Sequence, residues 1–164
     1  MSYLDGPRGV GGWLVLFLLA IGLFSPATAV FGLLSTMYGN RQLEVFYGPS
    51  WSALLTAEWT LVAISLLGCW AIVWRMMFVF RWSSVIFAVV GIWCVGVAAS
   101  LVEVLIVGWI AGVPLGKMAN GLGPELIRPI VFDTVWTAYL LKSQRVANTY
   151  PRHSEDEAVS EVFE

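Results

Sequence analysis

The sequence predicts an all-α polytopic membrane protein, a bundle of four transmembrane helices with both termini in the cytoplasm. The chain of 164 residues is 59% hydrophobic and only 12% charged, whereas soluble domains carry about a quarter charged residues. Its apolar residues come in long blocks, as membrane-spanning helices require. The nine Trp residues fit the same class, because Trp concentrates where hydrocarbon meets the lipid headgroups.

Four apolar blocks predict the helices, over residues 12–36, 53–74, 82–104 and 124–141. At about 1.5 Å per residue, each is long enough, or nearly so, to cross a hydrocarbon core of about 30 Å. We expect Pro26 to kink the first helix. Ala27 to Ala29 resembles a signal-peptidase site, but the block stays apolar beyond it, so we interpret it as a retained helix. The third block stays apolar as far as Val113, and its end is expected to tilt, project or lie in the interface.

The connections between the blocks are short or modest in length. Residues 114–123 are rich in Gly and Pro, which predicts an irregular, turn-rich outer loop. Residues 153–164 hold five acids and no Lys or Arg, and we expect them to form a disordered cytoplasmic tail after a transmembrane domain of residues 1–152.

The distribution of Lys and Arg predicts the orientation, because cytoplasmic loops carry an excess of these residues. With the N-terminus inside, the outer loops hold only Arg41 and Lys117, while Arg128 lies at or within the fourth helix. The cytoplasmic ends then hold Arg8, Arg75, Arg81, Lys142, Arg145 and Arg152. This imbalance favours both termini in the cytoplasm.

Two short motifs stand at the ends of the predicted bundle. Residues 9–14 read GVGGWL, and residues 139–150 read YLLKSQRVANTY. They resemble the opening Gly-x-Gly-Gly-Trp-Leu and the closing Tyr-x-x-x-Ser-x-Arg-Val-x-x-Thr-aromatic of a bacterial membrane-protein family catalogued as domain of unknown function family 2569. Glu58, early in the second helix, extends the resemblance, and Ala138 departs from it where the family has Pro. The resemblance implies the inner (plasma) membrane and a four-helix fold, and it implies no activity.

The two motifs also predict a cytoplasmic interface made by Trp13, Lys142 and Arg145. Trp13 would anchor at the headgroups, and the two bases complement a helix C-terminus and the anionic leaflet. Anchoring is the simpler interpretation, and a specific site for a protein or a lipid headgroup is the alternative.

Charged residues inside the predicted helices are costly in hydrocarbon and are therefore candidates for function. We estimate the height of each charged residue above the cytoplasmic end of its helix at about 1.5 Å per residue. This height is about 25 Å for Glu58, about 33 Å for Glu103, about 25 Å for Glu125 and about 21 Å for Arg128. We predict that these four residues form a polar cluster in the outer third of the bilayer, with Arg128 as partner of the acids. A structural clasp, a site for an ion, proton or polar substrate, and a contact with a partner protein all remain open.

Asp133 lies apart, only about 13–14 Å up and near the midplane. No base shares its depth, so we expect a neutral acid hydrogen-bonded to Ser65 or Thr137. Pro129 is expected to kink the helix between Arg128 and Asp133.

No group of residues predicts catalysis, a cofactor or a nucleic-acid partner. The single His, His153, lies in the tail, and Cys69 and Cys94 have the pattern of small buried apolar residues. We therefore expect a non-catalytic scaffold or accessory subunit that binds another membrane protein. The alternative is a small transporter or channel-like protein with a polar site in the outer leaflet, and a homo-oligomer is left open.

Overall fold

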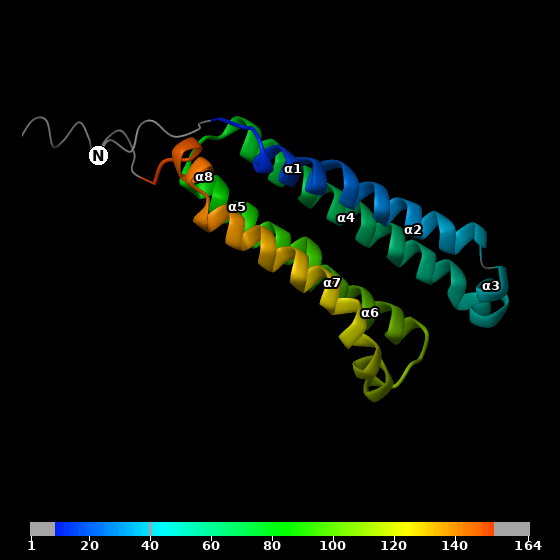
Figure 1. The fold of residues 1–164 in the computed structure, drawn as a ribbon. Coiled ribbons are helices and arrows are strands. Elements are labelled where there is room, and N and C mark those ends of the chain that lie inside the picture. The colour runs from blue at the N-terminus through cyan, green and yellow to red at the C-terminus, as the bar shows by residue number, and fades with distance from the viewer. Residues whose placement is uncertain (1–8, 40, 153–164) are drawn as a thin grey trace, which may run out of the picture.

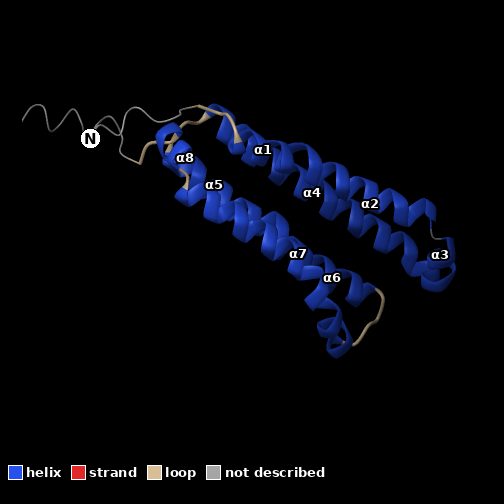
Figure 2. Ribbon diagram, viewed as in Figure 1, coloured by secondary structure: helices blue, strands red, loops and turns tan. Residues whose placement is uncertain are grey.

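The computed structural model describes residues 9–39 and 41–152, and helices make up nearly all of that length (Figures 1 and 2). The first rod runs through α1 (Trp13–Leu19), the π-helical turn η1 (Ala20–Phe24) and α2 (Ser25–Gly39). The second runs through α3 (Arg41–Tyr47), the 3₁₀ turn η2 (Gly48–Ser50) and α4 (Trp51–Phe78). The third runs through α5 (Trp82–Trp93), the π-helical turn η3 (Cys94–Ala98) and α6 (Ala99–Ile110), and α7 (Leu115–Lys142) and α8 (Gln144–Thr149) complete the chain.

Three of these helical segments are long and apolar enough to cross a membrane. They are Trp13–Tyr38, Glu44–Phe78 and Trp82–Ile110. α7 is as long as α4, at 28 residues, but it carries more charged side chains and is not one of the three candidate spans. The described part of the chain is therefore helical, with three candidate spans that fit a membrane protein.

The helices extend further than the apolar blocks indicated, and the prediction of an irregular loop over residues 114–123 was wrong. The connection is confined to residues 111–114, where Gly112 has φ +67° and Pro114 is extended at φ −61° and ψ 140°. Gly tolerates a positive φ without strain, so one tight turn reverses the chain and α7 begins at Leu115. The predicted tail, residues 153–164, lies outside the described residues.

The rods pack as two layers, which diverge toward one end of the molecule (Figure 1). α2 lies along α4, and α7 lies along α5 and α6, while α4 also contacts α5 and α6. At the end that we call the closed end, the start of α1, the turn between α4 and α5, and α8 come together. At the opposite end, which we call the open end, lie α3 and the turn between α6 and α7.

The hydrophobic core fills the closed half of the bundle. Its fully buried members come from α1, α4, α5, α7 and α8, and they include Leu14, Phe17, Ile72, Met76, Val85, Ile92, Leu140 and Val146. The rings of Phe17 and Trp136 lie 5.1 Å apart and join α1 to α7. Because the fully buried apolar residues gather at the closed end, the other half has room to enclose a cavity.

Pro26 explains the irregularity in the first rod. Proline has no N–H, so it cannot donate to the carbonyl four residues earlier, which belongs to Gly22 in η1. The indole Nε1 of Trp70 on α4 donates to that Gly22 oxygen at 3.2 Å instead. The helix therefore continues through Pro26 by way of a π turn, and the freed carbonyl is satisfied by a neighbouring helix.

Candidate functional site

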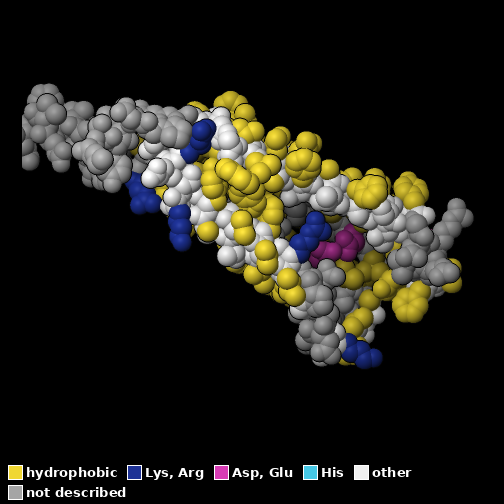
Figure 3. All heavy atoms as spheres, in the orientation of Figure 1, with side chains coloured by type: hydrophobic (Ala, Val, Ile, Leu, Met, Phe, Trp, Pro, Cys, Tyr) yellow, Lys and Arg dark blue, Asp and Glu magenta, His cyan; other side chains and the backbone are white. Residues whose placement is uncertain are grey.

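A cavity of about 830 Å³ opens between the two layers in the open half of the bundle. Its wall is formed by α2, α4, α6, α7 and both π turns. In the space-filling view, basic and acidic side chains lie next to each other in a hollow of the apolar face (Figure 3). The polar side chains of the wall include Ser25, Thr28, Glu58, Ser65, Ser100, Glu103, Arg128 and Asp133.

Three residues of the predicted polar cluster lie in this wall. Glu58 comes from α4, Glu103 from α6 and Arg128 from α7. Glu58 is half-buried, and its carboxylate lies close enough to Glu103 for their charges to interact. The side chain of Glu125, the fourth member, lies outside the part of the chain whose side chains the structure describes. The three residues thus share one cavity, and their role stays a prediction.

Asp133 belongs to the same cavity, although we expected it to stand apart. It is only 2% exposed, and its Oδ2 atom has no hydrogen-bond partner. Thr137, one of the two partners expected for it, accepts a hydrogen bond from Trp93 Nε1 at 3.0 Å instead. Asp133 lies against Gly96 of η3 in the wall of the cavity.

Gly96 makes room for this buried carboxyl group. A Cβ atom placed on Gly96 would overlap the Oδ2 atom of Asp133. Gly96 lies in the π turn η3, and the backbone of Val97 in the same turn is the group that hydrogen-bonds the carboxylate. No pattern in the sequence predicted a π turn at Gly96.

The irregular turns of the two layers face one another across the cavity. Ile21 and Phe24 of η1, Val95 and Gly96 of η3, and Pro129 of α7 all line it. Single π turns inside α-helices occur often at functional sites, because the extra residue changes which groups point inward. Their convergence on one cavity therefore marks it as the candidate site.

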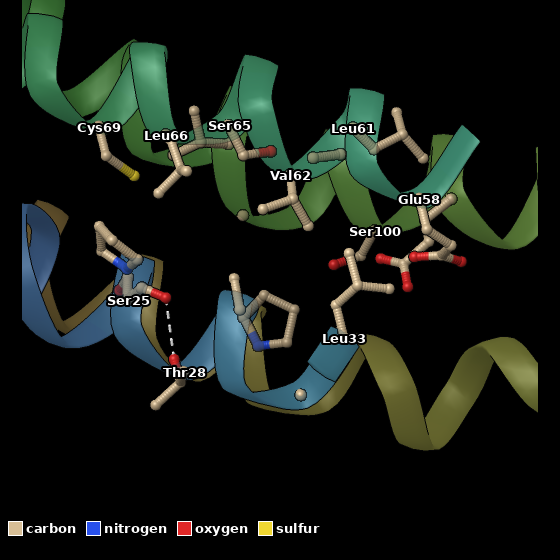
Figure 4. Close-up of a pocket in the computed structure, with 18 of the residues that line it drawn as sticks. Ser25, Thr28, Leu33, Glu58, Leu61, Val62, Ser65, Leu66, Cys69 and Ser100 are labelled. Atoms are coloured by element: carbon tan, nitrogen blue, oxygen red, sulfur yellow. Dashed lines mark hydrogen bonds between the residues drawn. The ribbon is translucent and has the colours of Figure 1, made fainter. Parts of the chain in front are cut away.

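The rest of the wall combines hydroxyl groups with apolar side chains (Figure 4). Glu58 of α4, Ser100 of α6 and Leu33 of α2 all line the cavity. The Thr28 hydroxyl is already engaged, since it donates to the Ser25 carbonyl at 2.9 Å. Cys69 is buried in the wall, whereas Cys94, which we expected to be buried, is exposed. Such a wall can bind a molecule that has both a polar and an apolar part.

The two terminal motifs meet at the closed end. Thr149 accepts a hydrogen bond from Gly9 N at 3.0 Å, and Arg145 packs over Gly11 so closely that a Cβ there would overlap its guanidinium group. Ser143 caps α8 by accepting from Val146 N at 3.5 Å. We call Gly9, Gly11, Gly12, Arg145, Thr149 and Tyr150 the terminal clasp.

Tyr150 completes the clasp from the far end of the chain. Its hydroxyl donates to the Met76 carbonyl at the end of α4, and its ring stacks on Phe80. The side chain is fully buried, and this burial raises the pKa of Tyr150 to about 12. Of the predicted interface residues, Arg145 thus has an internal contact, while Trp13 and Lys142 are exposed.

The described residues contain no group of three or more His, Cys, Asp or Glu side chains that could hold a metal ion. A family model with the description "Protein of unknown function (DUF2569)" matches residues 7–151, which include both terminal motifs and the charged residues of the cavity. No curated protein and no solved structure matches the chain.

Proposed function

We propose a function from the geometry, because the chain belongs to this DUF2569 family, as its terminal motifs predicted, and the family description names no activity. The protein binds a small polar solute inside the membrane and acts as a small transporter or channel-like protein. The observation that carries this proposal is the buried, unpartnered Oδ2 of Asp133 in the wall of an 830 Å³ cavity. A buried carboxylate oxygen without a partner is costly, and a ligand would offset that cost.

The membrane arrangement is part of the proposal. We place the protein in the bacterial inner membrane, with α7 as a fourth crossing and both termini in the cytoplasm. Support comes from the excess of Lys and Arg at the closed end. In this arrangement the charged face of α7 turns toward the cavity, as Asp133 and Arg128 do, and its apolar residues face lipid.

Accessibility of the cavity to water-soluble reagents tests the proposal. In a background with Cys69→Ala and Cys94→Ala, we expect Ser100→Cys to react with a small water-soluble thiol reagent in lipid nanodiscs. Thr134→Cys, on the exposed face of α7, is the matched control and should stay slow, because a thiol in lipid does not ionise readily. If Ser100→Cys is as slow as Thr134→Cys, the cavity is not a solute site.

The expected scaffold or accessory role remains the second candidate. The observation that favours it is α3 at the open end, where Val45 is 86% and Phe46 is 80% exposed. Such side chains suit contact with another membrane protein. Co-purification from gently solubilised membranes tests this role, and Val45→Ser with Phe46→Ser should release a partner that binds there.

A further inference from the structure

The charges of the cavity wall are unbalanced. Three carboxyl groups, those of Glu58, Glu103 and Asp133, face one guanidinium group, that of Arg128, among the described residues of the wall. With all four ionised, three negative charges and one positive charge leave a net charge of −2. An occupant with a positive charge would reduce this excess, whereas an anion would increase it.

The carboxyl groups lie at two levels of the same cavity. Glu58 and Glu103 interact as like charges, and a cationic occupant beside them would be attracted by both. Asp133, further along toward the core, is buried with its Oδ2 unpartnered. The buried Oδ2 atom is the stronger of the two signals, because no protein donor satisfies it.

The size and the apolar part of the wall narrow the class of ligand. A volume of about 830 Å³ is far larger than a bare metal ion needs. Leu33, Val62 and Phe132 contribute apolar surface beside the acids. Such a wall suits a molecule with an apolar body and one positive group.

We propose that the occupant of the cavity is an organic cation with an apolar body, held by the carboxylate of Asp133 and attracted by Glu58 and Glu103 at the wall. This inference rests on the proposed solute-binding function and adds the chemical class of the solute. The proposed site requires Gly96, because the lack of a side chain there leaves the space that the Asp133 carboxyl group occupies.

Binding of matched probes to the purified full-length protein in detergent tests the inference. We expect saturable binding of tetraphenylphosphonium, and weaker binding of neutral triphenylphosphine oxide and of tetraphenylborate, each measured separately by equilibrium dialysis. Asp133→Asn should weaken binding of the cation by about tenfold or more, the effect of removing one charged partner, and leave the neutral probe unchanged. Glu58→Gln, at a half-buried position, keeps the test valid if Asp133→Asn does not fold. Thr134→Ser is the control on α7, the helix that carries Asp133.

Several outcomes overturn the inference. It fails if the neutral or anionic probe binds as tightly as the cation, or if Asp133→Asn and Glu58→Gln both bind the cation like the parent protein. It also fails if no probe binds while Ser100→Cys reacts with thiol reagents, and the solute-binding function then survives without it. An inert Ser100→Cys would instead remove the proposed function itself.

Discussion

Single buried side chains join distant parts of this chain. Tyr150 shows this best, because its hydroxyl donates to the Met76 carbonyl and so ties the end of the described chain to α4. Thr149 does the same for Gly9 at the other terminus. Asp133 is the opposite case, a buried polar group with an unpartnered oxygen. At the residue scale, hydrogen-bonded hydroxyl groups thus stabilise the closed end, and a carboxylate oxygen without a hydrogen bond marks the cavity.

The burial of Tyr150 predicts a loss of stability at alkaline pH. The folded protein keeps the phenol proton to about pH 12, whereas the unfolded chain loses it near the ordinary pKa of 10.0. The folded state therefore binds more protons between these values, and stability falls as pH rises through this window. Below pH 10 the contribution is fully present.

Thermal unfolding in detergent from pH 9 to 12 checks this expectation. The Tm of the parent protein should fall more steeply than that of Tyr150→Phe, which has no proton to lose there. Tyr38→Phe is the control, because Tyr38 is 80% exposed. Equal slopes for the parent protein and Tyr150→Phe would show that the buried phenol does not control alkaline unfolding.

At the scale of elements, the helices depart from regular geometry where their sequence requires it. Gly12 is the N-cap of α1, and its φ of 57° and ψ of −133° suit only glycine. The π turn η1 ends immediately before Ser25 and Pro26, and the π turn η3 contains Gly96. These departures set the entry of the chain into the bundle and shape the wall of the cavity.

Gly12 should not tolerate a side chain. We expect Gly12→Ala to destabilise the protein by about 1–2 kcal/mol, the cost of placing an L-residue at positive φ. Gly32→Ala is the matched control, because nothing lies within 4 Å of the Cβ position at Gly32 in α2, and alanine there should be neutral or slightly stabilising. Tm values in one detergent compare the two, and a Gly12→Ala protein as stable as Gly32→Ala would contradict the argument.

Trp70 and Pro26 should be energetically coupled. Trp70→Phe leaves the Gly22 carbonyl without its donor and should cost about 0.5–1.5 kcal/mol. In a Pro26→Ala background the restored N–H of residue 26 can donate to that oxygen, so the same substitution should cost less. A double-mutant cycle on the unfolding free energy measures the difference. Additive effects would mean that the indole does not replace the bond that proline lacks.

At the scale of the whole molecule, the sequence predicted the all-helical membrane class and the family, because both follow from long apolar blocks and local motifs. Helix rise alone brought Glu58, Glu103 and Arg128 to similar depths, and all three line the cavity, whereas their clustering in the outer third of a bilayer stays a prediction. The sequence missed the divergence of the two layers, which depends on where side chains from five helical elements pack together. Asp133 was expected to hydrogen-bond to Ser65 or Thr137, and its Oδ2 atom instead has no partner in the wall of the cavity.

The two ends of the bundle also differ in chemistry. The closed end carries Arg81, Lys142, Arg145 and Arg152, and Arg152 lies 4.2 Å from the Trp82 ring centroid in a cation–π contact. The open end carries the exposed apolar residues of α3. Cytoplasmic loops carry an excess of basic residues, so this asymmetry is consistent with the proposed orientation, in which the closed end lies in the cytoplasm.

The fourth crossing is therefore the prediction that decides the architecture. In a background with Cys69→Ala and Cys94→Ala, an impermeant thiol reagent should label Val113→Cys on intact cells and Gln144→Cys only after permeabilisation, because α7 between them would cross the bilayer. Arg81→Cys, in the turn between α4 and α5, is the control for orientation and should behave like Gln144→Cys. Labelling of Gln144→Cys but not Arg81→Cys on intact cells would mean that α7 does not span, and labelling of both would mean that the whole bundle is inverted.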